Sequence, residues 1–156
     1  MIVDSGFIQA GGLDDTRVHD MIRAHITRAT AETAPGSNHA LDVSGLKAPG
    51  VEFWTLWQGD EPVGMGALKQ LGDGEGEVKS MYVLPETRGS GAGSLILGHI
   101  IAAARGHGLK RLSLETGAWD YFAPAWALYR RFGFVECPPF GDYVPDPNSL
   151  FFTVEL

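Results

Sequence analysis

One short segment of the chain has a residue spacing that suits phosphate binding. Arg88 is followed by glycines at Gly89, Gly91 and Gly93, and a run typical of a helix begins at once. Glycines let the backbone approach a ligand closely, and the free amides at a helix start lie at the positive end of its dipole. Arg88 adds a fixed positive charge at the same place. The segment therefore predicts a site for the pyrophosphate of a cofactor.

Three other interpretations of this glycine-rich segment compete with phosphate binding. A strand-to-helix turn can be rich in glycine without binding a ligand. A dinucleotide-binding fingerprint that begins at Gly89 requires its third glycine where Ser94 stands, and it follows the first strand of a domain. A P-loop requires Gly-Lys followed by Ser or Thr, and the sequence has no such triplet. The two nucleotide motifs fit worse, and the turn without a ligand stays open.

The elements that must position this segment are a mixture of strands and helices. Asp14 or Asp15 can cap a first helix, whose apolar residues between 18 and 29 recur every three or four positions. Three strand-like runs follow, and the short glycine-containing turns between them indicate an antiparallel meander. The expected order is strand 1–9, the first helix, a helical turn at 41–46, strands 51–58, 62–71 and 75–83, helix 91–107, strand 110–116, helix 120–132, and strands 134–137 and 150–156. This order predicts an α+β fold with a mixed, mostly antiparallel sheet.

Length and composition limit the domain organisation and the metal chemistry. Of the 156 residues, 44% are hydrophobic and 20% charged, so one domain over residues 1–156 can bury a sizeable core without disulfides. Cys137 is the one cysteine in the sequence, which excludes disulfide scaffolds and cysteine-based zinc sites. The five histidines show no zinc-ligand spacing, so no metal is expected.

The charge of the chain disfavours two classes of partner. Twelve basic and nineteen acidic residues give a net charge of −7, and no cluster of Lys and Arg interrupts the acidic background. Such a field repels nucleic-acid phosphates and anionic lipid. No run of about 18 apolar residues occurs, and the first residues lack the basic start of a signal peptide. We therefore expect a cytoplasmic protein with no nucleic-acid partner and no membrane attachment.

Two motifs together resemble the GNAT superfamily of acetyl-CoA-dependent N-acetyltransferases. The segment Arg88–Gly93 matches the family's phosphate loop, Gln/Arg-x-x-Gly-x-Gly/Ala, and Tyr82–Pro85 before it matches aromatic-Val-x-Pro. Further along, Ala125–Phe134 matches Ala-x-x-Leu-Tyr-x-x-x-Gly-Phe. The resemblance covers the whole chain in element order, and several shorter segments are similar to a bacterial branch of small family members. It implies a three-layer fold with helices on both faces of the sheet.

The resemblance also implies which residues bind acetyl-CoA. The loop amides would hold the pyrophosphate, and they belong to Arg88, Gly89, Ser90, Gly91, Ala92, Gly93 and Ser94. The pantetheine arm would pair with the backbone of the preceding strand at Met81, Tyr82 and Val83, where a backbone N–H polarises the thioester carbonyl. One departure removes a cofactor contact, since Phe122 stands where many relatives carry Asn.

Catalytic roles follow from the same resemblance. Tyr129 matches the general acid that protonates the departing thiolate, a transfer that the pKa values of a phenol and a thiol permit. Glu77 is the candidate base, acting directly or through water, and side-chain alternation would place it on one strand face with Lys79 and Met81. A solvent-facing carboxylate that merely pairs with Lys79 is the alternative for Glu77. Glu115, at the end of the next strand, is the second candidate base.

The implied function is transfer of acetyl from acetyl-CoA to a primary amine by direct attack in a ternary complex. The acceptor is a small molecule, an amino acid or a peptide, and the acidic chain favours a cationic one. A non-catalytic acyl-CoA-binding sensor is the alternative, and an acyl donor larger than acetyl stays open. Homodimers are frequent among similar proteins, and nothing in the sequence demonstrates one. The late loop that contains Tyr143 borders the acceptor in similar folds.

Overall fold

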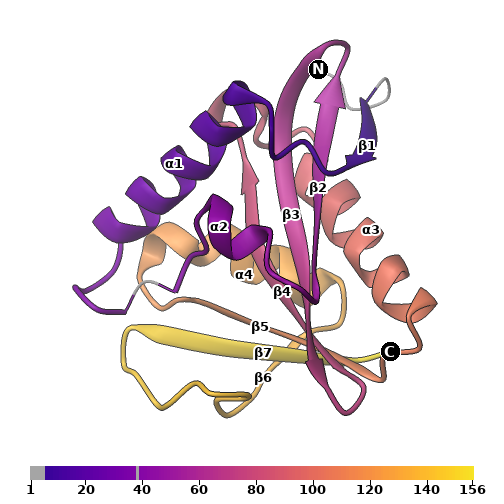
Figure 1. The fold of residues 1–156 in the computed structure, drawn as a ribbon. Helices are drawn as coiled ribbons and strands as arrows, with labels where there is room; N and C mark the ends of the chain where they lie inside the picture. The colour runs from indigo at the N-terminus through magenta and orange to yellow at the C-terminus, as the bar shows by residue number, and fades with distance from the viewer. Residues whose placement is uncertain (1–5, 38) are drawn as a thin grey trace.

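The elements of the chain follow the expected order (Figure 1). A computed structural model describes residues 6–37 and 39–156, so the first part of the expected strand 1–9 lies outside the described residues. The elements are β1 (Gly6–Ala10), α1 (Thr16–Ala31), α2 (Val43–Leu46), β2 (Val51–Gln58), β3 (Glu61–Gly72), β4 (Glu75–Val83), η2 (Pro85–Thr87), α3 (Ala92–Gly106), β5 (Arg111–Gly117), η3 (Asp120–Phe122), α4 (Ala123–Arg131), β6 (Val135–Glu136) and β7 (Ser149–Glu155).

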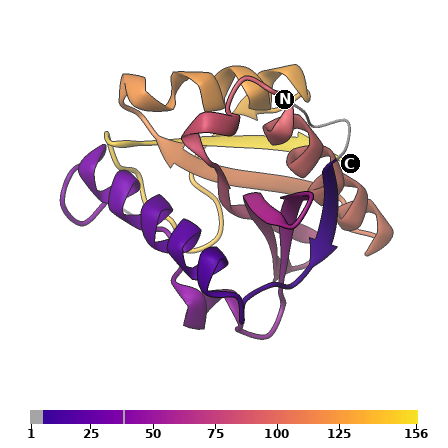
Figure 2. The same cartoon turned by 90° about the horizontal axis from the view of Figure 1, so that it is seen from above.

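The sheet and its two helical layers confirm the predicted fold class. The described strands form one sheet in the order β1-β2-β3-β4-β5-β7-β6, in which β4 and β5 pair in parallel and all other neighbours are antiparallel. Figure 2 shows α1 and α4 on opposite sides of this sheet. The sheet buries one hydrophobic cluster against α3 and α4, and a second against α1 and α2.

Local sequence accounts for the start of the first helix, and packing accounts for the division of the last one. Asp15 caps α1, because its side chain accepts a hydrogen bond from the backbone amide of Arg17 at 2.8 Å. The expected helix 120–132 is divided into a 3-10 turn and α4. Packing explains the division: the Phe122 ring lies against Gly117, where an added Cβ would come within 2.1 Å of the ring. The Trp126 indole N–H also donates to the Gly117 carbonyl at 3.0 Å.

Beta strands β4 and β5 separate soon after they meet. Their pairing runs from Glu75 with Arg111 to Glu77 with Ser113 and goes no further. On the other side, β4 stays paired with β3, but the register shifts between Lys79 and Tyr82. The edge of β4 that faces β5 is therefore left without a strand partner beyond Glu77.

A β-bulge at Ser80 corrects one prediction about β4. Ser80 has φ of +57°, a left-handed conformation that interrupts the alternation of side chains. Lys79 and Glu77 lie on the same side and contact each other, whereas Met81 packs with the α3 cluster on the other face. Tyr82 in turn packs with the α1 cluster. The prediction that Met81 shares a face with Glu77 and Lys79 is therefore wrong, because the bulge adds one residue between them.

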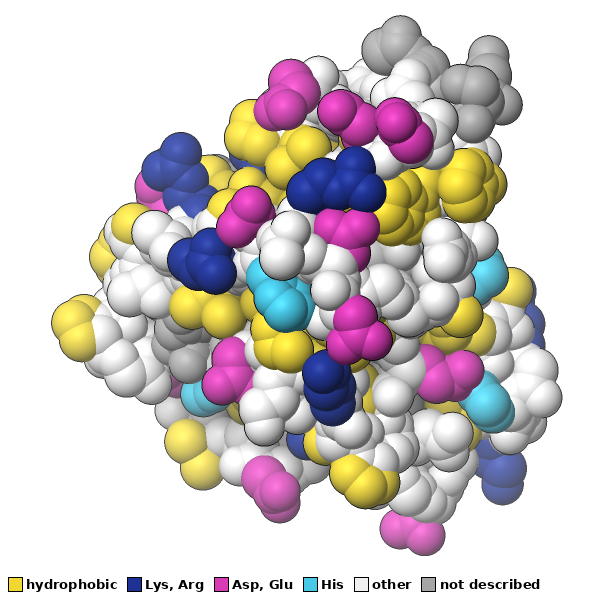
Figure 3. Space-filling view, turned by 45° about the horizontal axis from the view of Figure 1, so that its top comes forward, with side chains coloured by type: hydrophobic (Ala, Val, Ile, Leu, Met, Phe, Trp, Pro, Cys, Tyr) yellow, Lys and Arg dark blue, Asp and Glu magenta, His cyan; other side chains and the backbone are white. Residues whose placement is uncertain are grey.

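The charged side chains on the surface are mixed in sign. On the face shown in Figure 3, acidic and basic side chains lie interspersed among hydrophobic and neutral ones.

No helix in the part of the chain that the structure describes is long and apolar enough to cross a membrane.

Candidate active site

A cavity of about 710 Å³ lies where β4 and β5 diverge. Its wall combines α1 and the loop after it, β4, the start of α3, the end of β5, and α4. Every residue predicted for the site except Ser90 lines this cavity. The Ser90 hydroxyl instead donates to the Thr87 carbonyl at 2.5 Å and so ties the glycine loop to the turn before it. The structure therefore brings the predicted cofactor and catalytic residues to one place.

The glycine loop leaves backbone amides at the cavity wall. Gly89 and Gly91 have φ of +81° and +92°, and Gly91 caps α3 without any side-chain hydrogen bond. The first amides of α3 have no partner within the helix and lie at its positive end. A Cβ added to Gly89 or Gly91 would meet nothing within 4 Å, so the space beside both residues is open. This geometry suits an anionic group such as a pyrophosphate.

Gly93 serves a different purpose from the two glycines before it. A Cβ at Gly93 would lie 3.2 Å from Cδ2 of Leu128, which belongs to α4. The absence of a side chain thus lets α3 approach α4, the helix that carries Tyr129. Gly93 couples the position of the loop to the position of Tyr129.

Arg88 is held at the base of the loop. Its Nε donates to the Val83 carbonyl at 3.1 Å, and its guanidinium lies 5.4 Å from the centroid of the Tyr82 ring. Both contacts keep a positive charge beside the amides of the loop.

The free edge of β4 offers further polar groups to a ligand. The Ser80 side chain lines the cavity, and its Oγ is the one buried side-chain atom without a hydrogen-bond partner among the residues that the structure describes. A buried hydroxyl without a partner costs free energy, so a bound ligand that supplies one is favoured.

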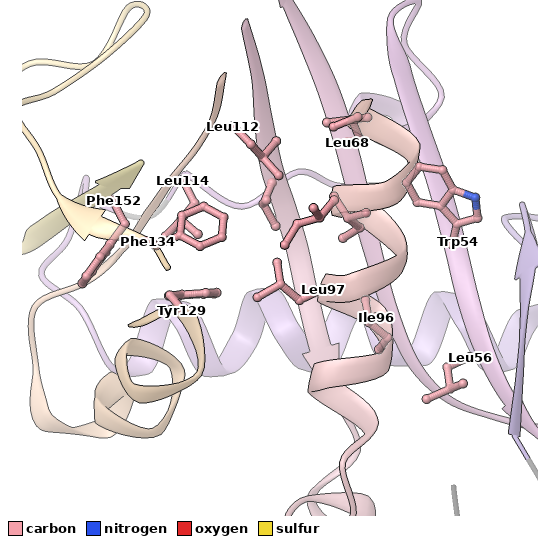
Figure 4. Packing of buried hydrophobic residues seen from close by; sticks show 14 of the residues in the cluster. Trp54, Leu56, Leu68, Ile96, Leu97, Leu112, Leu114, Tyr129, Phe134 and Phe152 are labelled. Atoms are coloured by element: carbon pink, nitrogen blue, oxygen red, sulfur yellow. The ribbon is translucent and has the colours of Figure 1, made fainter. Parts of the chain in front are cut away.

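Tyr129 presents a protonated hydroxyl to the same cavity. Its ring packs against Phe134 and Phe152, with centroids 6.0 Å away in each case, and Figure 4 shows it beside Phe134. Burial raises the pKa of Tyr129 to about 12, and the negative charge of Glu115 contributes. No described side chain or backbone group forms a hydrogen bond with the Tyr129 hydroxyl, which can therefore donate to a ligand.

Glu77 belongs to a buried cluster with Lys79 and Tyr143. Its side chain is 4% exposed, and its Oε2 accepts from the Tyr143 hydroxyl at 2.6 Å and from the Lys79 ammonium at 3.3 Å. Lys79 also donates to the Tyr143 hydroxyl at 3.0 Å. The interpretation of Glu77 as a solvent-facing carboxylate is therefore wrong, although its pairing with Lys79 is confirmed. Nothing in the sequence signals the Tyr143 contact, since it joins residues 66 positions apart.

Glu115 is a second carboxylate in the cavity wall, at the end of β5. Its Oε2 accepts a hydrogen bond from the Ser149 hydroxyl at 2.8 Å. Burial is the main cause that raises the pKa of Glu115, and the nearby charge of Glu77 acts in the same direction. The Ser149 hydrogen bond and the charges of His39 and Lys79 oppose this shift. A carboxyl group with a raised pKa suits the acceptance of a proton from an amine.

Comparison with known proteins assigns the chain to a family. The acetyltransferase (GNAT) family model matches residues 19–134. The chain belongs to the GNAT acetyltransferase family. It is 42% identical to the uncharacterized N-acetyltransferase YsnE of Bacillus subtilis over 149 residues, which are 96% of this chain and 99% of that protein. It is 45% identical to the IAA acetyltransferase of Azospirillum brasilense over 116 residues, 74% of each chain.

A solved structure supports the same assignment for this GNAT protein. The crystal structure of a Klebsiella pneumoniae protein named among the acyl-CoA N-acyltransferases superposes with a TM-score of 0.79 and 30% identity, over 97% of both chains. The predicted family, fold class and enzyme class are thereby confirmed. The chain is an N-acetyltransferase of the acetyl-CoA-dependent type.

Proposed function

We propose that this enzyme transfers an acetyl group from acetyl-CoA to the primary amine of a small molecule, by direct attack in a ternary complex. The observation that carries the proposal is that one cavity joins the glycine loop, the free edge of β4 and the Tyr129 hydroxyl. A thioester that enters between β4 and β5 meets an acid on one side and carboxylates on the other. Acceptor and donor then react without an acyl-enzyme intermediate.

The donor half of the cavity is built from backbone groups. The amides from Arg88 to Ser94 bind the pyrophosphate, with Arg88 as a fixed counter-charge. The free edge of β4 at Met81, Tyr82 and Val83 pairs with the amides of the pantetheine arm, and a backbone N–H there polarises the thioester carbonyl. These contacts place the reacting carbon between Tyr129 and the acceptor.

Tyr129 acts as the general acid in this proposal. The amine nitrogen forms a bond to the thioester carbon, the carbon–sulfur bond breaks, and the Tyr129 hydroxyl gives its proton to the sulfur. Its raised pKa keeps the hydroxyl protonated at every physiological pH, and it has no protein partner to compete for the proton. The phenolate that results takes up the surplus proton of the newly acylated nitrogen.

Two carboxylates are proposed to remove the proton from the incoming ammonium. Glu77 is the base that the family resemblance indicates, with its Oε2 engaged by Lys79 and Tyr143. Glu115 interacts electrostatically with Tyr129, and its raised pKa suits it to accept a proton. The dependence of kcat on pH in Glu77→Gln and in Glu115→Gln separates the two assignments. The fall of kcat at low pH reports protonation of the base, so only the variant that lacks the base should lose this fall.

The test of the proposed function is thiol release from acetyl-CoA by the purified protein across a panel of amines. A reaction without amine and the Cys137→Ser variant correct for the protein's own thiol. Release that depends on an amine, together with an acetylated product of the expected mass, supports the enzyme. Acetyl-CoA binding without turnover on any amine supports the acyl-CoA sensor instead. Absence of both binding and release refutes the assignment of the glycine loop.

A further inference from the structure

The half of the cavity away from the glycine loop contains few free charges. We call it the acceptor half, and it is lined by His25, Ser37, His39, Glu77, Lys79 and Glu115. Its charged groups have to match the charge of the acceptor, because a charge buried without a partner is costly. How each of these groups is already paired therefore indicates which acceptor fits.

The positive charge of Lys79 is already satisfied. Its side chain is 9% exposed, it lies 3.3 Å from the Glu77 carboxylate, and it donates to the Tyr143 hydroxyl at 3.0 Å. Its ammonium also lies 5.6 Å from the centroid of the Tyr143 ring. The Glu77–Lys79–Tyr143 cluster is therefore a wall with no net charge. A carboxylate on the acceptor would compete there with Glu77 for the same ammonium.

His25 adds no positive charge to the acceptor half. Burial and the nearby Lys79 lower its pKa to about 4, so the imidazole is neutral at physiological pH. Its ring instead lies 5.6 Å from the Tyr82 ring, as part of an aromatic wall. The acceptor half therefore offers an anionic group no free cation on α1 or β4.

Glu115 is a carboxylate without a salt-bridge partner of its own, although the charges of His39 and Lys79 act on it from nearby. Its hydrogen bond comes from the Ser149 hydroxyl, and no Lys or Arg within the described ranges forms a salt bridge with it. The groups around it are Glu77 and Lys79 on β4, His39 on the loop after α1, and Tyr129 on α4. One cation placed beside Glu115 would be matched by its carboxylate.

We propose that the acceptor is a primary amine with one positive charge and no carboxylate, whose ammonium group binds to Glu115. This inference rests on the proposed function and specifies its acceptor class. The ammonium gives one proton to Glu115, and the neutral amine then attacks the thioester carbon. Tyr129 protonates the departing sulfur, and the phenolate that results takes up the second proton that the nitrogen loses after attack. Free amino acids fit less well because of their carboxylate, and polyamines because a second ammonium has no partner.

The test compares phenethylamine, phenylalanine and phenylalanine amide, which share one skeleton, and the diamine putrescine, with acetyl-CoA as donor. Phenethylamine carries one positive charge and phenylalanine adds a carboxylate. Phenylalanine amide keeps the ammonium and replaces the carboxylate with an uncharged amide of similar size, and putrescine carries a second ammonium. We expect kcat/KM for phenethylamine and phenylalanine amide to exceed those for phenylalanine and putrescine by about tenfold or more, the effect of one unmatched charge. Equal or higher kcat/KM for phenylalanine or putrescine overturns the inference while leaving the proposed function intact. No turnover with any amine refutes the proposed function itself.

A charge variant tests the role given to the neutral cluster. Glu77→Gln frees the charge of Lys79 and should narrow the preference for phenethylamine over phenylalanine by about tenfold. Tyr143→Phe is the matched control, because it removes a hydrogen bond from the same carboxylate and leaves the charge unchanged. An unchanged preference in Glu77→Gln contradicts the assignment of Glu77 to a neutral wall. Loss of all activity with acetyl-CoA still bound identifies Glu77 as the base and overturns the transfer of the ammonium proton to Glu115. If Glu77→Gln does not fold, the wild-type comparison still decides.

Discussion

Replacement of Tyr129 by Phe tests the chemistry with the least disturbance of the fold. The substitution removes one hydroxyl and keeps the ring that packs against Phe134 and Phe152. Because the hydroxyl has no hydrogen bond to any described group, no protein donor or acceptor is left unpaired. We therefore expect the free energy of unfolding to change by less than about 1 kcal/mol. Thermal unfolding followed by circular dichroism measures this change.

The expected loss of activity follows from the energetics of the proton transfer. The pKa of Tyr129 is about 12, against about 8.5 for a free thiol, so complete transfer to a relaxed thiolate is uphill by about 5 kcal/mol. That is well below the barrier of about 15 to 17 kcal/mol for turnover at 1–100 s⁻¹, so the phenol remains competent as an acid. Without it, the thiolate must leave unprotonated, and kcat should fall by about 10²- to 10⁴-fold.

The assay separates the acid from a binding role. Steady-state thiol release gives kcat, and isothermal titration gives the Kd for CoA, which should stay within about threefold of wild type because the cofactor contacts are backbone groups. Tyr121→Phe is the control, since Tyr121 lines the same cavity and packs beneath the Arg28 guanidinium. Tyr129→Phe with wild-type kcat refutes the reasoning, and an equal loss in Tyr121→Phe points to a general disturbance of the cavity.

Four further substitutions test the site and its supports. Glu115→Gln should raise the midpoint of thermal unfolding at pH 8 but not at pH 4. Because the pKa of Glu115 is raised in the fold, the protonated carboxyl favours folding at low pH, and this contribution is lost as the pH rises through that pKa. Equal effects of the substitution at both pH values contradict this reasoning. Gly91→Ala should weaken CoA binding about tenfold or more, which isothermal titration measures. Gly93→Ala should instead lower the free energy of unfolding by about 1 kcal/mol, because the added methyl group crowds Leu128, and thermal unfolding measures this loss. Ser80→Gly should raise the free energy of unfolding of the CoA-free protein by about 1 kcal/mol, because glycine tolerates the positive φ and lacks the unpartnered hydroxyl. Urea unfolding measures the change, and a loss of stability argues against strain at the bulge.

The sequence was sufficient for the order of the elements and for the cofactor loop, because both depend on local signals. The Asp15 cap, the turns of the meander and the glycines before α3 each act within a few residues of themselves. The identity of the elements followed from these signals, and, apart from the last helix, the boundaries among the described residues moved by no more than two residues. The division of the last helix was not predictable in this way, because it depends on the Phe122 ring that packs on Gly117.

The acceptor half depends on contacts that no local pattern encodes. Alternation along β4 predicts a shared face for Glu77 and Met81, yet a single residue in the left-handed region at Ser80 reverses every side chain after it. The same bulge leaves the Ser80 hydroxyl unpaired beside the gap between β4 and β5. Backbone strain and an unpaired hydroxyl at Ser80 both cost stability, and such costs are typical of a functional site where a bound ligand offsets them. The stability of Ser80→Gly with and without bound CoA therefore reports on the ligand: the advantage of glycine should shrink when CoA is bound, and an unchanged advantage means that the hydroxyl makes no contact with it.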